Sequence, residues 1–340
     1  MILHPKGDIA LNLLEPTFAK LELGQTQSHK NLAMVPLFGP NLSPVEYVTL
    51  DDAIGSGAVT VSEVSDSGSV SEINLQNHGT LPVFMLDGEE LIGAKQNRIL
   101  NLSVLAPAVQ TITIPVSCVE QGRWSFQSPV FCSSNRAQYS RGRAAKANMV
   151  SNSLASGASA RTDQQEIWRD LDAKSNAFRV RSESGAMSDI YESESTAIDK
   201  FVETFKAQPD QVGCIFLLND RVAGFDLFEN SRTLAKLLQK LVRSYALDAL
   251  ETDNKSNLEG KAEIAVTFKD GIAETRLNQF PGVGLGTDYR FADETLSGGA
   301  LVYEDRLIHV SAFPSNEEDQ SGQVGRRGRL ARSSQRRNLH

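Results

Sequence analysis

The sequence has few cysteines, no long hydrophobic run and no leader-like beginning. It has three cysteines among 340 residues, Cys118, Cys132 and Cys214, and their odd number and wide spacing give no disulfide framework and suggest a reducing compartment. No run of about 18 apolar residues occurs, so no membrane span is predicted. The N-terminus lacks a basic region before a long apolar stretch, which argues against a signal peptide. These absences together predict a cytoplasmic protein without a membrane partner.

Positive charge is also scarce over most of the chain. The formal net charge is −8, even though the last 19 residues contain six arginines and no acid. An acidic body repels polyanions, so nucleic-acid binding is not favoured. Nonspecific contact through the arginine-rich end stays possible, but residues 313–340 are expected to be a disordered, solvated tail. Hydrophobic residues make up 40% and charged residues 22% of the chain, which is typical of a globular protein.

The sequence contains no recognisable metal or phosphate motif. The five histidines are scattered, and none has another ligand type at a helical i+4 position in a known pattern, so zinc is not expected. The cofactor is unknown. Magnesium held by Asp87, Glu89 or Glu90 stays possible, because this ion needs few protein ligands. Neighbouring glutamates on a strand point to opposite faces, so Glu89 and Glu90 would share one ion only if Gly88 formed a turn.

Short apolar runs with period two dominate both ends of the chain. Up to about residue 119 they follow one another without helical segments, which favours antiparallel pairing. The middle of the chain has helical patterns, most clearly at 234–245. Strands are predicted again at 262–268 and 272–278, around a turn at 269–271, and at 296–313. The predicted fold is α+β, with antiparallel β-sheets from the N- and C-terminal parts and helices from the middle.

Domain organisation follows from the same pattern. Neither β-rich half looks complete without the other, so residues 1–312 are predicted to form a single compact domain. Residues 133–162 contain few large apolar side chains and several basic ones without an acid, which predicts a mobile basic loop. This loop is either solvated or a lid that clamps an anion over a site. The stretch 182–195 is acidic and rich in serine, and is expected to be exposed.

Polar side chains gather at one place on the predicted N-terminal strands. The stretch 83–124 begins with a short apolar run, continues into the polar segment DGEELIGAKQNR, and ends in the strand-like segment IPVSCVEQGRW. Strands that lead into charged and amide side chains are typical of a rigid scaffold that presents a site. The alternative is a solvated hairpin tip with ordinary surface charge.

These two segments also carry a family resemblance. LDGEELIGAKQNR and IPVSCVEQGRW resemble the ADP-ribosylglycohydrolase- and rhodanese-phosphatase-associated protein domain, an uncharacterised prokaryotic family. The resemblance covers roughly residues 10–312. It implies an association with enzymes that process ADP-ribose derivatives, and it implies no particular catalytic residue.

Glu90 and Glu120 are the candidate catalytic residues in this stretch. An inward-facing Glu90 would suit a general acid or base. If Arg98 or Lys95 lay beside it, Glu90 would form a structural ion pair instead. Cys118 has no histidine close in sequence to activate it, so it is interpreted as a buried core residue.

A nucleotide-like ligand would need anion-binding and amide groups. Arg98, Arg123 and Arg290 are candidates for holding a pyrophosphate, because guanidinium groups match phosphate oxygens. Gln96 and Asn97 are candidates for hydrogen bonds to a base or a ribose. The indole of Trp124 could stack on a base or pack in the core.

The sequence therefore supports two hypotheses. The first is recognition or processing of a nucleotide-sugar metabolite of the ADP-ribose type in a polar site on a β scaffold. The second is a noncatalytic interaction module, in which the same residues form a structural polar network. Whether the protein is an enzyme, and its oligomeric state, are left open. The two hypotheses differ in whether the polar groups converge on an open pocket or are paired and covered.

Overall fold

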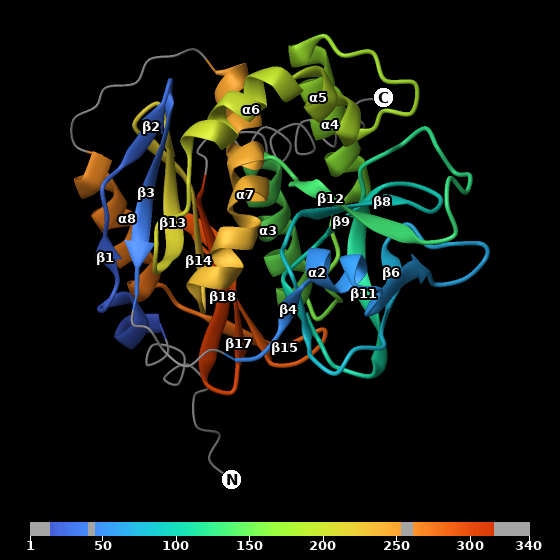
Figure 1. Ribbon diagram of the computed structural model, residues 1–340, viewed down its shortest axis with the longest axis horizontal. Coiled ribbons are helices and arrows are strands. Elements are labelled where there is room, and N and C mark those ends of the chain that lie inside the picture. Colours follow the sequence, from blue (N-terminus) through green and yellow to red (C-terminus); the bar gives the residue numbers. More distant parts are fainter. Residues whose placement is uncertain (1–13, 40–44, 253–260, 316–340) are drawn as a thin grey trace, which may run out of the picture.

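The computed structural model describes residues 14–39, 45–252 and 261–315, which form two β-rich lobes with helices between and around them (Figure 1). This arrangement confirms the predicted α+β class and the origin of the sheets in both ends of the chain. The helices are α2 (Leu50–Gly55), α3 (Ser140–Ala155), α4 (Gln164–Phe178), α5 (Met187–Ser193), α6 (Ser195–Thr204), α7 (Ser231–Glu251) and α8 (Lys261–Glu274). None of these described helices combines the length and apolarity needed to cross a membrane.

One lobe is built on a nine-stranded antiparallel sheet that joins the two ends of the chain. Its order is β1-β3-β13-β14-β18-β17-β16-β15, and β2 also pairs with β3. The strands are β1 (Glu22–Leu23), β2 (Gln27–His29), β3 (Leu32–Phe38), β13 (Gln211–Leu218), β14 (Arg221–Phe228), β15 (Asn278–Pro281), β16 (Thr287–Ala292), β17 (Leu296–Tyr303) and β18 (Arg306–Pro314). Because β3 pairs with β13, the N-terminal strands cannot complete this sheet by themselves.

The other lobe contains two smaller sheets. A six-stranded antiparallel sheet has the order β12-β8-β9-β11-β6-β5, and a three-stranded sheet has the order β10-β7-β4, in which β4 and β7 are parallel. The strands are β4 (Val48–Thr49), β5 (Val59–Glu63), β6 (Glu72–Asn77), β7 (Val83–Met85), β8 (Glu89–Gly93), β9 (Arg98–Leu100), β10 (Val104–Ala106), β11 (Gln110–Cys118) and β12 (Phe131–Ala137).

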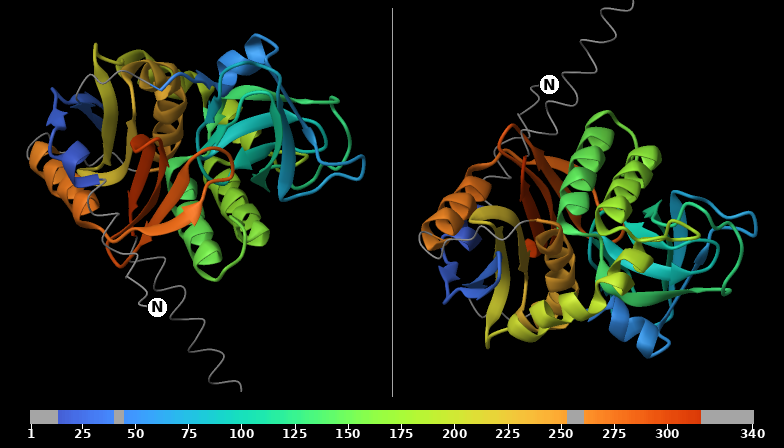
Figure 2. Two further views of the ribbon diagram at one scale, coloured as in Figure 1. Left: turned by 90° about the horizontal axis from the view of Figure 1, so that it is seen from below. Right: turned by 90° about the horizontal axis from the view of Figure 1, so that it is seen from above.

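Helices α7 and α8 cover opposite faces of the large sheet (Figures 1 and 2). Side chains along a strand alternate between faces. Met34 accordingly belongs to the core cluster that contains the apolar face of α7, whereas Ala33 and Val35 belong to the cluster that contains α8. Helix α7 begins after Asn230, whose side chain accepts a hydrogen bond from the backbone N–H of Thr233.

The prediction of two strands and a turn between 262 and 278 is wrong, because most of this segment forms helix α8. Its buried residues Lys261, Ala265, Lys269 and Ile272 recur at intervals of three and four residues, which is the spacing of one helical face. The apolar residues of this segment also satisfy a period of two, and Gly271 suggested a turn. A glycine inside a helix costs only about 1 kcal/mol, which burial of the helix against the sheet offsets.

The segment 133–162 also differs from its prediction as a mobile basic loop. The structure instead forms the end of β12 and the whole of α3 there. Arg143 and Lys146 have no exposed surface, and the Lys146 ammonium donates a hydrogen bond to the Leu100 carbonyl at 2.7 Å. The sequence leaves open whether these charges are solvated or clamp an anion, whereas the structure pairs them inside the protein. The predicted tail begins at 313, yet Phe313 and Pro314 end β18 and residues 316–340 lie outside the described residues.

A buried ion cluster joins the two lobes. The Arg143 guanidinium of α3 donates to Asp87, which follows β7, at 2.9 Å and to Asp226 of β14 at 2.6 Å. The Asp226 carboxylate also accepts a hydrogen bond from the Tyr245 hydroxyl at 3.2 Å. Burial by itself would raise the pKa of Asp87, but Arg143, Lys146 and His309 hold that pKa well below its ordinary value. Asp87 and Asp226 thus share one cation across the lobe boundary.

Replacement of Arg143 by methionine should strongly destabilise the fold. The Arg143→Met variant leaves Asp87 and Asp226 buried without their common cation, and removing one partner of a buried ion pair costs about 3–5 kcal/mol. Urea denaturation should show this loss of unfolding free energy. Arg141→Ala, in the same helix, is the matched control. Its guanidinium is half exposed beside Glu251, and its removal should cost less than about 1 kcal/mol. Similar losses for both variants would contradict the role given to Arg143.

Candidate functional site

The two sequence segments of the polar motif meet through strand pairing. Strands β8 and β9 form a hairpin with a turn at 94–97, and β11 pairs with β9 so that Cys118 lies opposite Arg98. Residues that follow Cys118 therefore lie beside this turn. The sequence left open whether Gln96, Asn97 and Arg98 meet the residues after β11, and this register brings them together.

Glu120 is the centre of a hydrogen-bond network at this junction. Its Oε2 atom accepts from the Asn97 backbone N–H at 3.0 Å and from Arg123 Nη2 at 2.5 Å. Its Oε1 atom accepts from Arg123 Nε and from the Ser184 hydroxyl, each at 2.9 Å. Burial favours a higher pKa for Glu120, but the hydrogen bonds from Arg123, Asn97 and Ser184 lower it. Glu120 is thus held as a carboxylate with both oxygens occupied.

The guanidinium of Arg123 likewise has all its nitrogens hydrogen-bonded within the protein. Its Nη1 atom donates to the carbonyls of Ala94 at 2.7 Å and Ser125 at 3.1 Å. Its Nη2 atom also donates to the Asn97 side-chain oxygen at 3.2 Å and the Gly93 carbonyl at 3.3 Å. A guanidinium has five N–H donors, and these contacts with Glu120 and the backbone use each of its nitrogens. Arg123 therefore fixes the 94–97 turn against the segment after β11.

Arg98, Gln96 and Cys118 form the buried side of the same network. The Arg98 side chain is fully buried, and its Nη1 atom donates to the Gln96 carbonyl at 3.1 Å and to Gln96 Oε1 at 3.2 Å. The Cys118 thiol lies 3.2 Å from the same amide oxygen. Burial is the largest cause that raises the pKa of Cys118, so the thiol form is favoured. The interpretation of Cys118 as a core residue is confirmed.

Glu90 lies elsewhere on β8 and is covered. It is 0% exposed, and its Oε2 atom accepts from Arg136 Nε at 2.7 Å and from the Ser134 hydroxyl at 3.0 Å. The sequence suggested Arg98 or Lys95 as its ion-pair partner, whereas β12 provides Arg136. Arg290 is also separate, because it belongs to β16 of the large sheet and pairs with Asp288 at 2.7 Å. Neither residue joins the network around Glu120.

The carboxylates considered for magnesium each have a cationic partner. Asp87 contacts Arg143, Glu89 contacts Lys240 and Glu90 contacts Arg136. Among the described residues, one group of metal-type ligands lies within 4.8 Å, namely Asp87, Asp226 and His309. Arg143 already bridges the two carboxylates of that group, so its charges do not fit a divalent cation as they stand.

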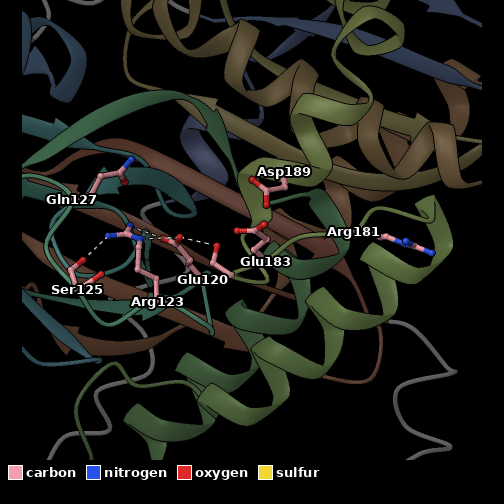
Figure 3. A pocket seen from close by; sticks show the side chains of 8 residues that line it. Glu120, Arg123, Ser125, Gln127, Arg181, Glu183 and Asp189 are labelled. Carbon is pink, nitrogen blue, oxygen red and sulfur yellow. Dashed lines mark hydrogen bonds and ion pairs between the residues drawn. The ribbon is translucent and has the colours of Figure 1, made fainter.

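A cavity of about 590 Å³ opens beside the Glu120–Arg123 pair (Figure 3). All of its lining residues are polar or charged: Glu120, Arg123, Ser125, Gln127, Arg181, Glu183, Ser184 and Asp189. They come from two segments that are far apart in the chain. The Gly122 N–H donates to the Ser184 carbonyl at 2.7 Å, and a side chain at Gly122 would lie 2.9 Å from Ser184 Cα. The close approach of these two backbones therefore requires Gly122.

The segment 181–189 supplies the groups that the sequence analysis missed. Arg181 and Glu183 are exposed, and neither makes an ion pair or a side-chain hydrogen bond with the described part of the chain. Asp189 also lines the cavity and accepts a hydrogen bond from the Ser182 hydroxyl. One cation without an ion-pair partner in the described chain and two carboxylates thus line a polar cavity, whose volume is within the usual range of about 300–1,000 Å³ for ligand sites. The Arg181 side chain extends away from the Glu120–Arg123 pair (Figure 3).

The fold and site define an α+β protein in which a hydrogen-bonded polar network around Glu120 and Arg123 lies beside an open, charged cavity. The chain belongs to the ARG and Rhodanese-Phosphatase-superfamily-associated Protein domain family, whose model matches residues 20–313. No curated protein and no solved structure matches the chain.

The pKa of Glu120 leads to a prediction about stability and pH. Because folding lowers this pKa from its ordinary 4.5, the contribution of Glu120 to stability should be complete above about pH 5 and should disappear as the pH falls through the lower, folded-state pKa. At pH 7 the Glu120→Gln variant should lose about 1.5–3 kcal/mol of unfolding free energy, the usual contribution of a hydrogen bond to a charged group.

Urea denaturation between pH 7 and pH 3 measures the difference between wild type and variant. The difference in unfolding free energy between wild type and Glu120→Gln should become smaller as the pH falls from 5 to 3. Glu166→Gln is the control, because Glu166 forms an exposed pair with Arg169 and its removal should have little effect at any pH. A difference for Glu120→Gln that stays constant down to pH 3 would show that its carboxylate charge is not what stabilises the fold.

Proposed function

We propose that the chain recognises a nucleotide-sugar ligand of the ADP-ribose type in the cavity formed by 120–127 and 181–189. The observation that carries this proposal is the contrast between the cavity's two walls. The Glu120–Arg123 wall is saturated by internal hydrogen bonds, whereas Arg181 and Glu183 have no such partner in the described chain. A rigid wall beside free charged groups is what a preorganised binding site needs.

The polar groups that line the cavity match the chemistry of a nucleotide sugar. The Glu183 and Asp189 carboxylates are acceptors for ribose hydroxyls, and the Gln127 amide can both donate and accept. The Arg181 guanidinium provides a planar set of donors for phosphate oxygens. A cavity lined by both charges favours a ligand that combines hydroxyl groups with an anionic group.

The motif residues have a supporting role in this proposal. Gln96, Asn97 and Arg98 form the structural network, and Arg123 holds Glu120 in place. This is the arrangement expected of the noncatalytic alternative, extended here by a ligand site that the network supports. Arg290 belongs to the large sheet and has no direct part in it.

Recognition without conversion is favoured by the state of the carboxylates. A general acid or base works best with a pKa near the working pH. Glu120 has a lowered pKa and four hydrogen-bond donors around it, so it is a poor proton donor. Glu90 is buried and does not line the cavity. Neither residue suits acid–base catalysis on a ligand bound there.

The family description adds independent support for the ligand class. It names an association with ARG, the ADP-ribosylglycohydrolase, and with rhodanese-phosphatase proteins. A protein that accompanies an enzyme acting on ADP-ribose derivatives has reason to recognise such a molecule. This association, together with the charge pattern of the cavity, selects ADP-ribose as the first probe.

Calorimetric titration with ADP-ribose tests this proposal. Wild type should bind, and Arg181→Ala should weaken binding about tenfold or more, because a charge-assisted hydrogen bond contributes about 1.5–3 kcal/mol. Arg169→Ala is the matched control, since Arg169 is exposed on α4 and does not line the cavity. It should bind as wild type does, and mass spectrometry should recover the ligand unchanged. Failure of wild type to bind, or equal affinities of wild type and Arg181→Ala, would contradict the proposal.

A further inference from the structure

Two large exposed aromatic side chains belong to the chain segment that forms one wall of the cavity. Trp124 is 47% exposed and Phe126 is 53% exposed. The other exposed large hydrophobic residues of the described chain, Leu81, Val109 and Val266, are aliphatic and lie far from this segment in sequence. Exposed aromatic groups that are close together mark interaction sites more often than single exposed aliphatic residues do.

The two aromatic residues alternate with residues that line the cavity. Trp124 stands between Arg123 and Ser125, and Phe126 stands between Ser125 and Gln127. Consecutive Cα atoms are about 3.8 Å apart, so each aromatic residue is attached within one residue step of the cavity wall. The segment therefore contributes polar side chains to the cavity and carries two exposed aromatic side chains between them.

Both aromatic rings contact the same cation, Lys95. Lys95 Nζ lies 5.3 Å from the centroid of the Trp124 ring and 4.9 Å from that of Phe126. The same ammonium donates to the Ser67 carbonyl at 3.0 Å, and Lys95 is only 9% exposed. Cation–π contacts of this kind fix the orientation of a ring at an exposed site. The rings are thus ordered before any partner arrives, which reduces the entropic cost of binding.

We infer that Trp124 and Phe126 form a stacking subsite for the nucleobase of the ligand whose sugar and phosphate groups occupy the cavity. This inference rests on the proposed function and specifies its ligand as one that carries a base. The surface changes from flat and aromatic to polar and charged within a few residues, which matches the division of a nucleotide into base and sugar phosphate. Stacking of a base on an aromatic side chain contributes about 1–3 kcal/mol.

Fluorescence titration tests the subsite, because the chain has two tryptophans, Trp124 and Trp168. The Trp168→Phe variant leaves Trp124 as the reporter. ADP-ribose should quench its emission, and ribose 5-phosphate, which lacks the base, should not. By calorimetry, Trp124→Ala should weaken ADP-ribose binding about tenfold and leave ribose 5-phosphate binding unchanged. Trp124→Phe should retain most of the affinity, because phenylalanine also stacks.

The outcomes separate this inference from the function on which it rests. If Trp124→Ala binds ADP-ribose like wild type while Arg181→Ala is weakened, the subsite is wrong and the cavity proposal stands. If Trp124→Ala weakens the binding of both ligands equally, the tryptophan supports the cavity wall and does not stack on the base. The inference is then also wrong. If wild type binds neither ligand, the proposed function and the subsite both fail.

Discussion

The described structure depends on one buried arginine that two lobes share. Arg143 reaches from α3 to Asp87 in one lobe and to Asp226 in the large sheet of the other. Either aspartate would be costly to bury without that cation. Formation of the large sheet, packing of α3 and closure of the β7–β8 turn are therefore coupled. We propose that this coupling makes the two lobes one folding unit.

Hairpin turns and the buried face of a helix were predictable, because each depends on one local rule of sequence. The hairpins at Asn219–Asp220 and Glu304–Asp305 have positive φ at both turn residues, which polar residues tolerate and which matches the twist of antiparallel strands. The apolar stripe of α7 likewise identified its buried face. The segment of α3 was predicted as a mobile connection because Arg143 and Lys146 face the interior, and the sequence does not show which partner neutralises a buried charge.

Only one of the two segments that form the candidate site was predictable from the sequence. The gathering of Gln96, Asn97, Arg98, Glu120 and Arg123 follows from strand pairing between neighbouring motif segments. The contribution of 181–189 depends on a contact between Gly122 and Ser184, which no periodic pattern encodes. Glu120 and Arg123 form one hydrogen-bonded wall of the cavity. Arg181 and Glu183, which have no ion-pair partner in the described chain, come from the segment that packs against this wall. Under the proposed function, the residues that support the cavity wall are thus separate from the residues that would bind the ligand.

Hydrogen exchange with and without ADP-ribose, read by mass spectrometry, tests that separation most directly. Backbone amides of 86–100 should already be protected in the free protein and should change little, because β8 and β9 are buried and paired with neighbouring strands without ligand. Amides of 121–130 and 181–189 should gain protection when ADP-ribose is added. Protection gained within 86–100 but absent from 181–189 would contradict the account, since the motif would then contact the ligand itself.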